Sequence, residues 1–201
     1  CQRWLERRED AELPLAPALR ETGLGLLVGF LLFSGVTGAV ALLGGFEILG
    51  VRGWGAIWSM LGLAIYSGVF EEVLFRGVVL RHLERMTGTW IALALTSAFF
   101  GFGHLGNPGA TWFAGLAISL EAGIMLGAVY LLTWRLWVAI GIHAAWNFTQ
   151  GWVYSIPVSG GDAPLGLLIT RRAGPDWLTG GEFGLEASAV ALVIATAVGA
   201  A

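Results

Sequence analysis

The sequence Glu71-Glu72-Val73-Leu74-Phe75-Arg76 interrupts a long apolar run, which spans residues 53–70 before it and continues through residues 77–80 after it. Two adjacent carboxylates are expensive to bury when ionised, and they repel one another. In a helix, Glu72 and Arg76 lie four residues apart on one face and can form an ion pair. Glu71 points about 100° away around the helix. The stretch therefore predicts a helix in which arginine holds one carboxylate while Glu71 is free to act as a general base.

The composition around this stretch is that of an integral membrane protein. Of the 201 residues, 56% are hydrophobic and 12% are charged, whereas a soluble domain typically carries about 25% charged residues. The mean hydropathy is +0.75, and the apolar residues lie in long blocks. The predicted fold class is therefore all-α, a polytopic bundle of transmembrane helices. Cys1 is the single cysteine, which excludes an intrachain disulfide and a cysteine-based metal cluster.

The apolar blocks predict about six membrane spans. They cover residues 23–45, residues from about 54 to 81, residues 90–104, residues 111–133, residues 137–156 and a last block from about 185. Between them, residues 46–53 and 157–185 are predicted to be loops, the second with a re-entrant or interfacial piece at residues 165–170. Because the chain starts with Cys and stops inside an apolar run, we expect residues 1–201 to be one membrane-embedded domain truncated at both ends.

The arginines predict how the chain is oriented in the membrane. If residues 1–22 are cytoplasmic, the cytoplasmic segments hold seven arginines (Arg3, Arg7, Arg8, Arg20, Arg81, Arg85 and Arg135), and the outer segments hold Arg52, Arg171 and Arg172. The excess of arginine on one side favours this orientation. The expected location is the cell membrane, as a multi-pass protein of a bacterial inner membrane. The lipid bilayer is an expected partner, and nucleic acid is not.

Ionisable residues inside membrane spans are rare and are candidates for function by default. The set here is Glu71, Glu72, Arg76, His104, Glu121 and His143, with Asn147 as a polar companion. Glu71 and His104 each lie ~20 Å from the turn that joins the second and third spans, so they can meet at one level. His143 lies roughly 9 Å into its own span, which is shallower unless the second and third helices protrude into the cytoplasm. His143 and Asn147 are four residues apart and share a face.

Three chemical interpretations of this set stay open. Glu71 and His104 could hold and deprotonate a water molecule that attacks a carbonyl, while His143 and Asn147 stabilise the oxyanion. Alternatively, Glu71, His104 and His143 could bind Zn²⁺ with an open fourth position, although the HExxH spacing is absent. The third interpretation is a set of buried polar groups that hold helices together. We expect no essential cofactor, with zinc as the alternative.

The order of three motifs resembles the CPBP family, which comprises CAAX prenyl proteases and bacteriocin-processing enzymes and is also called Abi. The motifs are Glu71-Glu72-x-x-x-Arg76, Phe100-x-x-x-His104 and His143-x-x-x-Asn147, and the resemblance covers residues 54–152. It implies an α-helical intramembrane endopeptidase acting on a membrane-associated peptide or protein.

By the same resemblance, Glu71 with His104 would activate water, His143 with Asn147 would stabilise the oxyanion, and Glu72 with Arg76 would hold the site in shape. Glu121 belongs to no motif and could pack helices or line a cavity. One alternative is a non-catalytic, CPBP-like immunity or peptide-binding protein. An ion-coupled transporter is a weaker one, because the sequence shows no inverted repeat.

Overall fold

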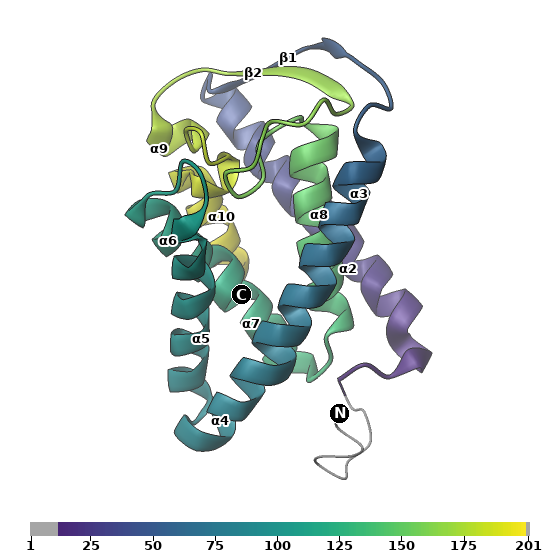
Figure 1. The fold of residues 1–201 in the computed structure, drawn as a ribbon, viewed down its shortest axis with the longest axis vertical. Coiled ribbons are helices and arrows are strands. Elements are labelled where there is room, and N and C mark those ends of the chain that lie inside the picture. Colours follow the sequence, from purple (N-terminus) through teal and green to yellow (C-terminus); the bar gives the residue numbers. More distant parts are fainter. Residues whose placement is uncertain (1–11, 200–201) are drawn as a thin grey trace.

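The computed structural model describes residues 12–199 of the chain, and they are mainly helical (Figure 1). The described part of the chain begins with α2 (Leu15–Leu42) and β1 (Phe46–Val51). A continuous helix over residues 57–87 follows; it consists of α3 (Ile57–Tyr66), η1 (Ser67–Glu71), η2 (Val73–Leu80) and α4 (Arg81–Thr87). We call it helix 57–87. The prediction of a helical membrane-type fold is confirmed at the level of its class.

Three further helices complete the centre of the fold. The first consists of α5 (Thr89–Gly103) and η3 (His104–Gly106). The second, helix 112–133, consists of α6 (Trp112–Ile118), η4 (Ser119–Ile124) and α7 (Met125–Thr133). The third, helix 137–153, consists of α8 (Trp137–Phe148) and η5 (Thr149–Val153). The segments η1, η2, η4 and η5 are π-helical, a wider winding that is frequent near functional sites.

The remaining elements are β2 (Leu168–Arg172), α9 (Asp176–Thr179), η6 (Leu185–Ala187) and α10 (Ala189–Gly199). The strands β1 and β2 pair antiparallel, with Phe46 opposite Arg172 and Val51 opposite Leu168. The prediction of a loop is therefore wrong for residues 46–51 and for residues 168–172, whereas the re-entrant or interfacial piece at residues 165–170 stays a prediction. β1 and β2 form their backbone hydrogen bonds with each other. Because more than a hundred positions separate the paired residues, the local sequence of either strand does not predict the pairing.

By length and composition, three helices of the described residues can cross a membrane, namely Leu15–Leu42, Thr89–Gly106 and Trp112–Thr133. The predicted count of about six spans is not confirmed. The other predicted spans differ from these three helices in charge or in length. Helix 57–87 carries three charged side chains in its middle, whereas helix 137–153 and α10 are shorter than the three. The first span also begins earlier than predicted, at Leu15, because residues 15–22 continue the helix toward the N-terminus.

Helix 57–87 and α5 protrude beyond the turn between α7 and α8 at the lower end of the molecule (Figure 1). The depth of His143 follows from this protrusion. Glu71 lies sixteen residues before the end of helix 57–87 at Thr87, and His143 lies six residues after the start of α8 at Trp137, yet the two side chains meet. The structure therefore has these two helices protruding relative to α7 and α8, while their protrusion into the cytoplasm stays a prediction.

The core lies where α2 packs along α8, the most extensive contact between two helices. Gly25 and Gly29 of α2 face the backbone of α8, so a Cβ atom on Gly29 would lie 2.4 Å from the carbonyl oxygen of Ile142. Phe33 and Trp146 pack edge to face in the same interface, with ring centroids 5.1 Å apart. This close packing fixes the position of α8, the helix that carries His143 and Asn147.

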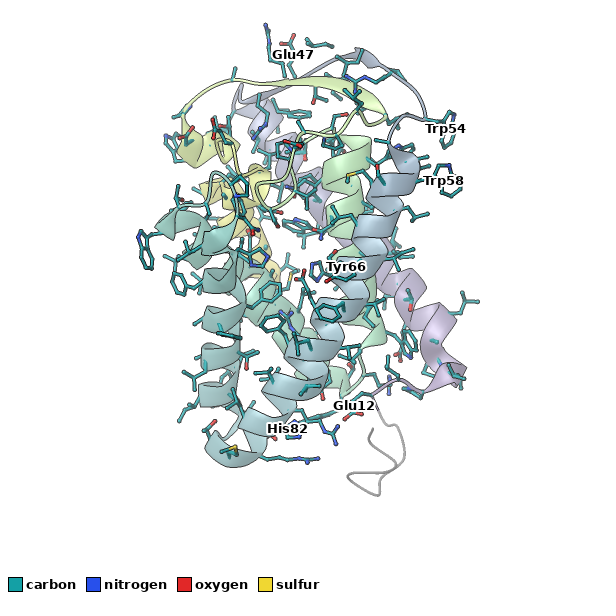
Figure 2. All side chains as sticks on the ribbon, viewed as in Figure 1. Glu12, Glu47, Trp54, Trp58, Tyr66 and His82 are labelled. Carbon is teal, nitrogen blue, oxygen red and sulfur yellow. The ribbon has the colours of Figure 1, made fainter. Side chains whose placement is uncertain are left out.

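Two tryptophan side chains near the β1–β2 end are exposed. Figure 2 shows Trp54 and Trp58 extending outward beside α3, and both are largely exposed. Exposed tryptophans near the end of an apolar helix are typical of the boundary between lipid and water.

Candidate active site

Glu72 is the centre of the polar network and has no exposed surface. Its Oε1 atom accepts a hydrogen bond from Arg76 Nη1 and another from His143 Nδ1, both at 2.8 Å. Because a carboxylate can only accept, the proton in the second bond belongs to His143 Nδ1. Nε2 of the same ring lies 3.9 Å from Glu71 Oε2. Glu72 therefore orients the imidazole so that its second nitrogen faces Glu71.

Arg76 joins this network to helix 112–133. Its Nη2 atom donates to the carbonyl oxygens of Ala122 at 2.8 Å and Gly123 at 3.2 Å. The guanidinium also lies 4.6 Å from the centre of the Phe100 ring, a favourable cation–π distance. Ala122 and Gly123 belong to the π-helical segment η4, where the altered winding leaves carbonyl groups open to other donors. Arg76 is buried, and these contacts offset part of its desolvation cost.

Asn147 lies one turn after His143 on α8, and its amide points toward helix 57–87. The Nδ2 atom donates to Ser67 Oγ at 2.8 Å, and the Ser67 hydroxyl in turn donates to the Ala64 carbonyl at 3.4 Å. An amide nitrogen carries two hydrogens, so one N–H of Asn147 is used to position the side chain and the other is left for a different acceptor.

His104 lies at the end of α5, where the helix tightens into η3. Its Nδ1 atom lies 2.8 Å from the Phe100 carbonyl oxygen, so Nδ1 carries the hydrogen and Nε2 is left as a proton acceptor. Within residues 12–199, Glu71 and His104 share neither a hydrogen bond nor an ion pair. The predicted partnership of these two residues thus has no direct contact.

A cavity of about 40 Å³ adjoins the network. Three of the predicted site residues line it: His104, His143 and Asn147. A site needs roughly 10–15 Å³ of this kind of space to hold one water molecule, so the cavity has room for a few. Glu71 is not part of the lining; its Oε2 atom lies 3.9 Å from His143 Nε2, and its side chain is 24% exposed.

Two carboxylates that the sequence motifs do not include also line this cavity, Glu121 and Glu186. Glu121 was noted in the sequence as an intramembrane charge without an assigned role. Glu186 and its partner Ser159, whose backbone N–H donates to Glu186 Oε1 at 2.5 Å, were missed. Both come from the segment between η5 and α10, which reads as a loop, and no local pattern shows that it folds back onto the helices.

The zinc alternative can be compared with this arrangement. Ligand atoms of one tetrahedral Zn²⁺ lie about 2.0–2.2 Å from the ion and therefore roughly 3.3 Å from each other. Glu71 Oε2 and His143 Nε2, at 3.9 Å, come close to this spacing. However, no three His, Cys, Asp or Glu side chains of the described residues gather closely enough to hold an ion. Glu71, His104 and His143 therefore do not form a three-ligand zinc centre as they are arranged here.

Fold and site together define a membrane protein of helices around a small, histidine-lined acidic cavity. Residues 53–149 match the family described as type II CAAX prenyl endopeptidase Rce1-like, and this match supports the assignment to the CPBP/CAAX protease family. The resemblance inferred from the three motifs is confirmed, over nearly the same residues. Neither a curated protein nor a solved structure matches the chain.

Proposed function

We propose that this protein is an intramembrane endopeptidase that hydrolyses a peptide bond of a membrane-associated substrate with an activated water molecule. The observation that supports this proposal best is the cavity itself. It brings His104, His143 and Asn147 together inside the segment that matches a protease family, with Glu71 3.9 Å from His143. No serine or cysteine nucleophile is needed for this chemistry.

In the proposed reaction, Glu71 and His104 act as the base. Water bound in the cavity gives a proton to this pair, with His104 Nε2 as the acceptor that its Nδ1 hydrogen bond leaves open. The water oxygen then bonds to the carbonyl carbon of the substrate, and the carbonyl oxygen becomes an oxyanion. When the C–N bond breaks, the leaving nitrogen takes the proton back, so that an acid and an amine are formed and the base is restored.

His143 and Asn147 stabilise the oxyanion in this proposal. The second N–H of the Asn147 amide is available as a donor, because the first is bonded to Ser67. His143 can donate through Nε2 only when both ring nitrogens carry hydrogen, since Nδ1 is already bonded to Glu72. Glu72 and Arg76 act as positioning residues that hold the imidazole and connect it to helix 112–133.

The proposed substrate is a membrane-associated peptide or protein, as the family description implies for its members. The protein itself would be a multi-pass protein of the cell membrane, with about six spans and the location of a bacterial inner membrane. Whether the substrate carries a prenyl group is best decided by offering the same peptide with and without one.

The test compares the wild-type protein in detergent with three variants, Glu71→Gln, His104→Ala and Glu47→Gln. The substrates are peptides with an acyl or a prenyl anchor, and metal content is measured on the same samples. We expect Glu71→Gln and His104→Ala each to lower kcat/KM by about 10²–10⁴-fold. Glu47 lies on β1, where it pairs with Arg171 at the surface, so Glu47→Gln should cleave like wild type.

Two results would overturn the proposed mechanism. Stoichiometric zinc that is lost in the Glu71 or His104 variant would replace a protein-only base with a metal-bound water. Peptide binding that persists in all variants, without cleavage by any of them, would leave the non-catalytic immunity or peptide-binding protein as the function.

A further inference from the structure

Glu121 is a buried carboxylate that the proposed reaction does not use. It lies in η4, in the middle of helix 112–133, and is only 2% exposed. Its Oε2 atom has no hydrogen-bond partner among residues 12–199, and its side chain lines the cavity. An ionised carboxylate without a partner in such surroundings costs several kcal/mol. The site therefore suits an occupant that supplies a hydrogen-bond donor, a positive charge or both.

The charges around the cavity indicate which kind of occupant fits. Glu186, 4% exposed, contributes a second carboxylate to the wall. Arg76 is the nearby arginine of the network, but its hydrogen bonds go to Glu72 and to the carbonyl oxygens of Ala122 and Gly123, and within residues 12–199 none goes to Glu121. With Glu71 and Glu72 added, four carboxylates surround a region that holds one arginine and two histidines. Because the carboxyl groups outnumber the arginine and histidine side chains, a ligand that brings a positive charge complements this wall better than an anionic one.

We propose that Glu121, together with Glu186, binds the ammonium group of a lysine side chain next to the scissile bond of the substrate. This inference rests on the proposed endopeptidase function and adds a substrate class to it. The neighbouring position follows because Glu121 shares one small cavity with His104, His143 and Asn147. Lysine is preferred over arginine, since about 40 Å³ accommodates a compact ammonium group more readily than a planar guanidinium.

The deciding experiment measures binding, so that it does not depend on cleavage. The probes are palmitoylated peptides in which one norleucine is replaced by lysine or by arginine at each position in turn. They are titrated into the Glu71→Gln variant and into the same variant carrying Glu121→Gln. We expect at least one lysine peptide to bind tenfold or more tightly than its norleucine counterpart to Glu71→Gln. In the double variant, this ratio should fall to about one.

Two further variants separate charge from structure. Glu186→Gln keeps an oxygen that can accept from the Ser159 N–H, so it should fold and should reduce the lysine preference by a smaller factor than Glu121→Gln. Glu47→Gln removes an exposed carboxylate outside the cavity and should leave the preference unchanged. Thermal unfolding of each variant in detergent checks that a lost preference is not a lost fold.

A cleavage assay of the wild-type protein on the same peptides separates the inference from the proposed function. Cleavage without a lysine preference in either assay would overturn the inference and leave the endopeptidase intact. Lysine-dependent binding that needs Glu121, without any cleavage, would overturn the endopeptidase and support the lysine site. Equal binding of lysine and norleucine peptides at every position would refute the lysine site in every case.

Discussion

At the scale of single residues, Glu72 determines the geometry of the candidate site. One of its oxygens accepts from both Arg76 and His143, so this buried carboxylate has a cation on one side and the imidazole on the other. The other oxygen, Oε2, has no partner within the described residues. No further donor among these residues can therefore replace Arg76 or His143, and the loss of either one leaves the Glu72 carboxylate poorly compensated.

The first prediction concerns Arg76. Replacing it in Arg76→Met leaves Glu72 buried without its cation, and breaking a buried pair in this way typically costs about 3–5 kcal/mol of unfolding free energy. The double variant Glu72→Gln/Arg76→Met removes both charges and should recover part of that loss. Denaturation in detergent, followed by a folding-sensitive signal, measures both effects.

The control for this prediction is the exposed pair Arg171–Glu47 on the strands. Arg171→Gln should cost less than about 1 kcal/mol, because exposed ion pairs contribute little. Equal losses for Arg76→Met and Arg171→Gln would show that Arg76 does not stabilise the buried network.

The second prediction concerns Ser67, which bonds the amide of Asn147. Ser67→Ala removes a neutral hydrogen bond worth about 1 kcal/mol, so we expect kcat to fall roughly five- to tenfold with little change in KM. In an Asn147→Ala background, Ser67→Ala should have no further effect on kcat, because its influence passes through the amide. Additive losses in the two backgrounds would show a separate structural role for Ser67.

The sequence allowed the contact between Glu72 and Arg76 to be predicted, because both residues lie on one helix at a spacing that fixes their geometry. It did not reveal the bond from His143 to Glu72, since 71 positions separate the two residues. Only the packing of α8 against helix 57–87 brings them together. The pair of Glu71 and His104 around one water molecule, expected from their equal depths, stays a prediction, because equal depth does not fix the rotation of either helix.

At the scale of elements, the π-helical segments position the site. Glu71 ends η1, Arg76 lies in η2 and Glu121 lies in η4. A wider turn changes which way successive side chains point and releases carbonyl groups, as Arg76 exploits at Ala122 and Gly123. Periodicity analysis assumes 3.6 residues per turn, so it predicted the helices but not these local changes of winding.

The third prediction uses two glycines of α2. In Gly29→Ala, the new Cβ would lie 2.4 Å from the Ile142 carbonyl oxygen and must push α2 away from α8. Overpacking of this kind typically costs about 1–3 kcal/mol, and the shift should also lower activity, because His143 follows Ile142. Stability in detergent and kcat/KM are the measurements.

Gly35 is the matched control on the same helix, since a Cβ there meets nothing within 4 Å. Gly35→Ala should leave activity unchanged and raise stability by up to about 0.5–1 kcal/mol, as alanine does in a helix interior. If Gly29→Ala proved as stable and active as Gly35→Ala, the close approach of α2 and α8 would not be required to place the site.

At the scale of the whole molecule, arginines outside the buried network lie at both ends of the molecule. Arg81 and Arg135 pair with Glu12 and Glu21 at the α4 end, whereas Arg171 pairs with Glu47 at the strand end. The arginines at positions 3, 7 and 8, which the orientation argument also used, lie outside the described residues. The orientation of these two ends in the membrane stays a prediction.

The fourth prediction tests this orientation. In a Cys1→Ser background, Glu84→Cys at the α4 end and Asp162→Cys at the opposite end are labelled in intact cells with a membrane-impermeant maleimide. The excess of arginine at the α4 end predicts that it faces the cytoplasm. Asp162→Cys should therefore react in intact cells, and Glu84→Cys should react only after permeabilisation. The reverse pattern would invert the orientation.

The pairing of β1 with β2 was not predicted from the sequence. β1 and β2 are short, lie next to glycines and are far apart along the chain, so each reads alone as a polar connection between apolar blocks. The family match, in contrast, was predictable, because it depends on residue types at fixed spacings along three helices.

The pairing of β1 with β2 also imposes an order on how the protein is made. Glu47 and Arg171, which face each other across the strands, are 124 residues apart, and the helices of the candidate site lie between them. At a synthesis rate of about 5–20 residues per second, β1 leaves the ribosome roughly 6–25 s before its partner. The two strands can therefore pair only late in biogenesis. Once they have paired, every helix between them has already been synthesised.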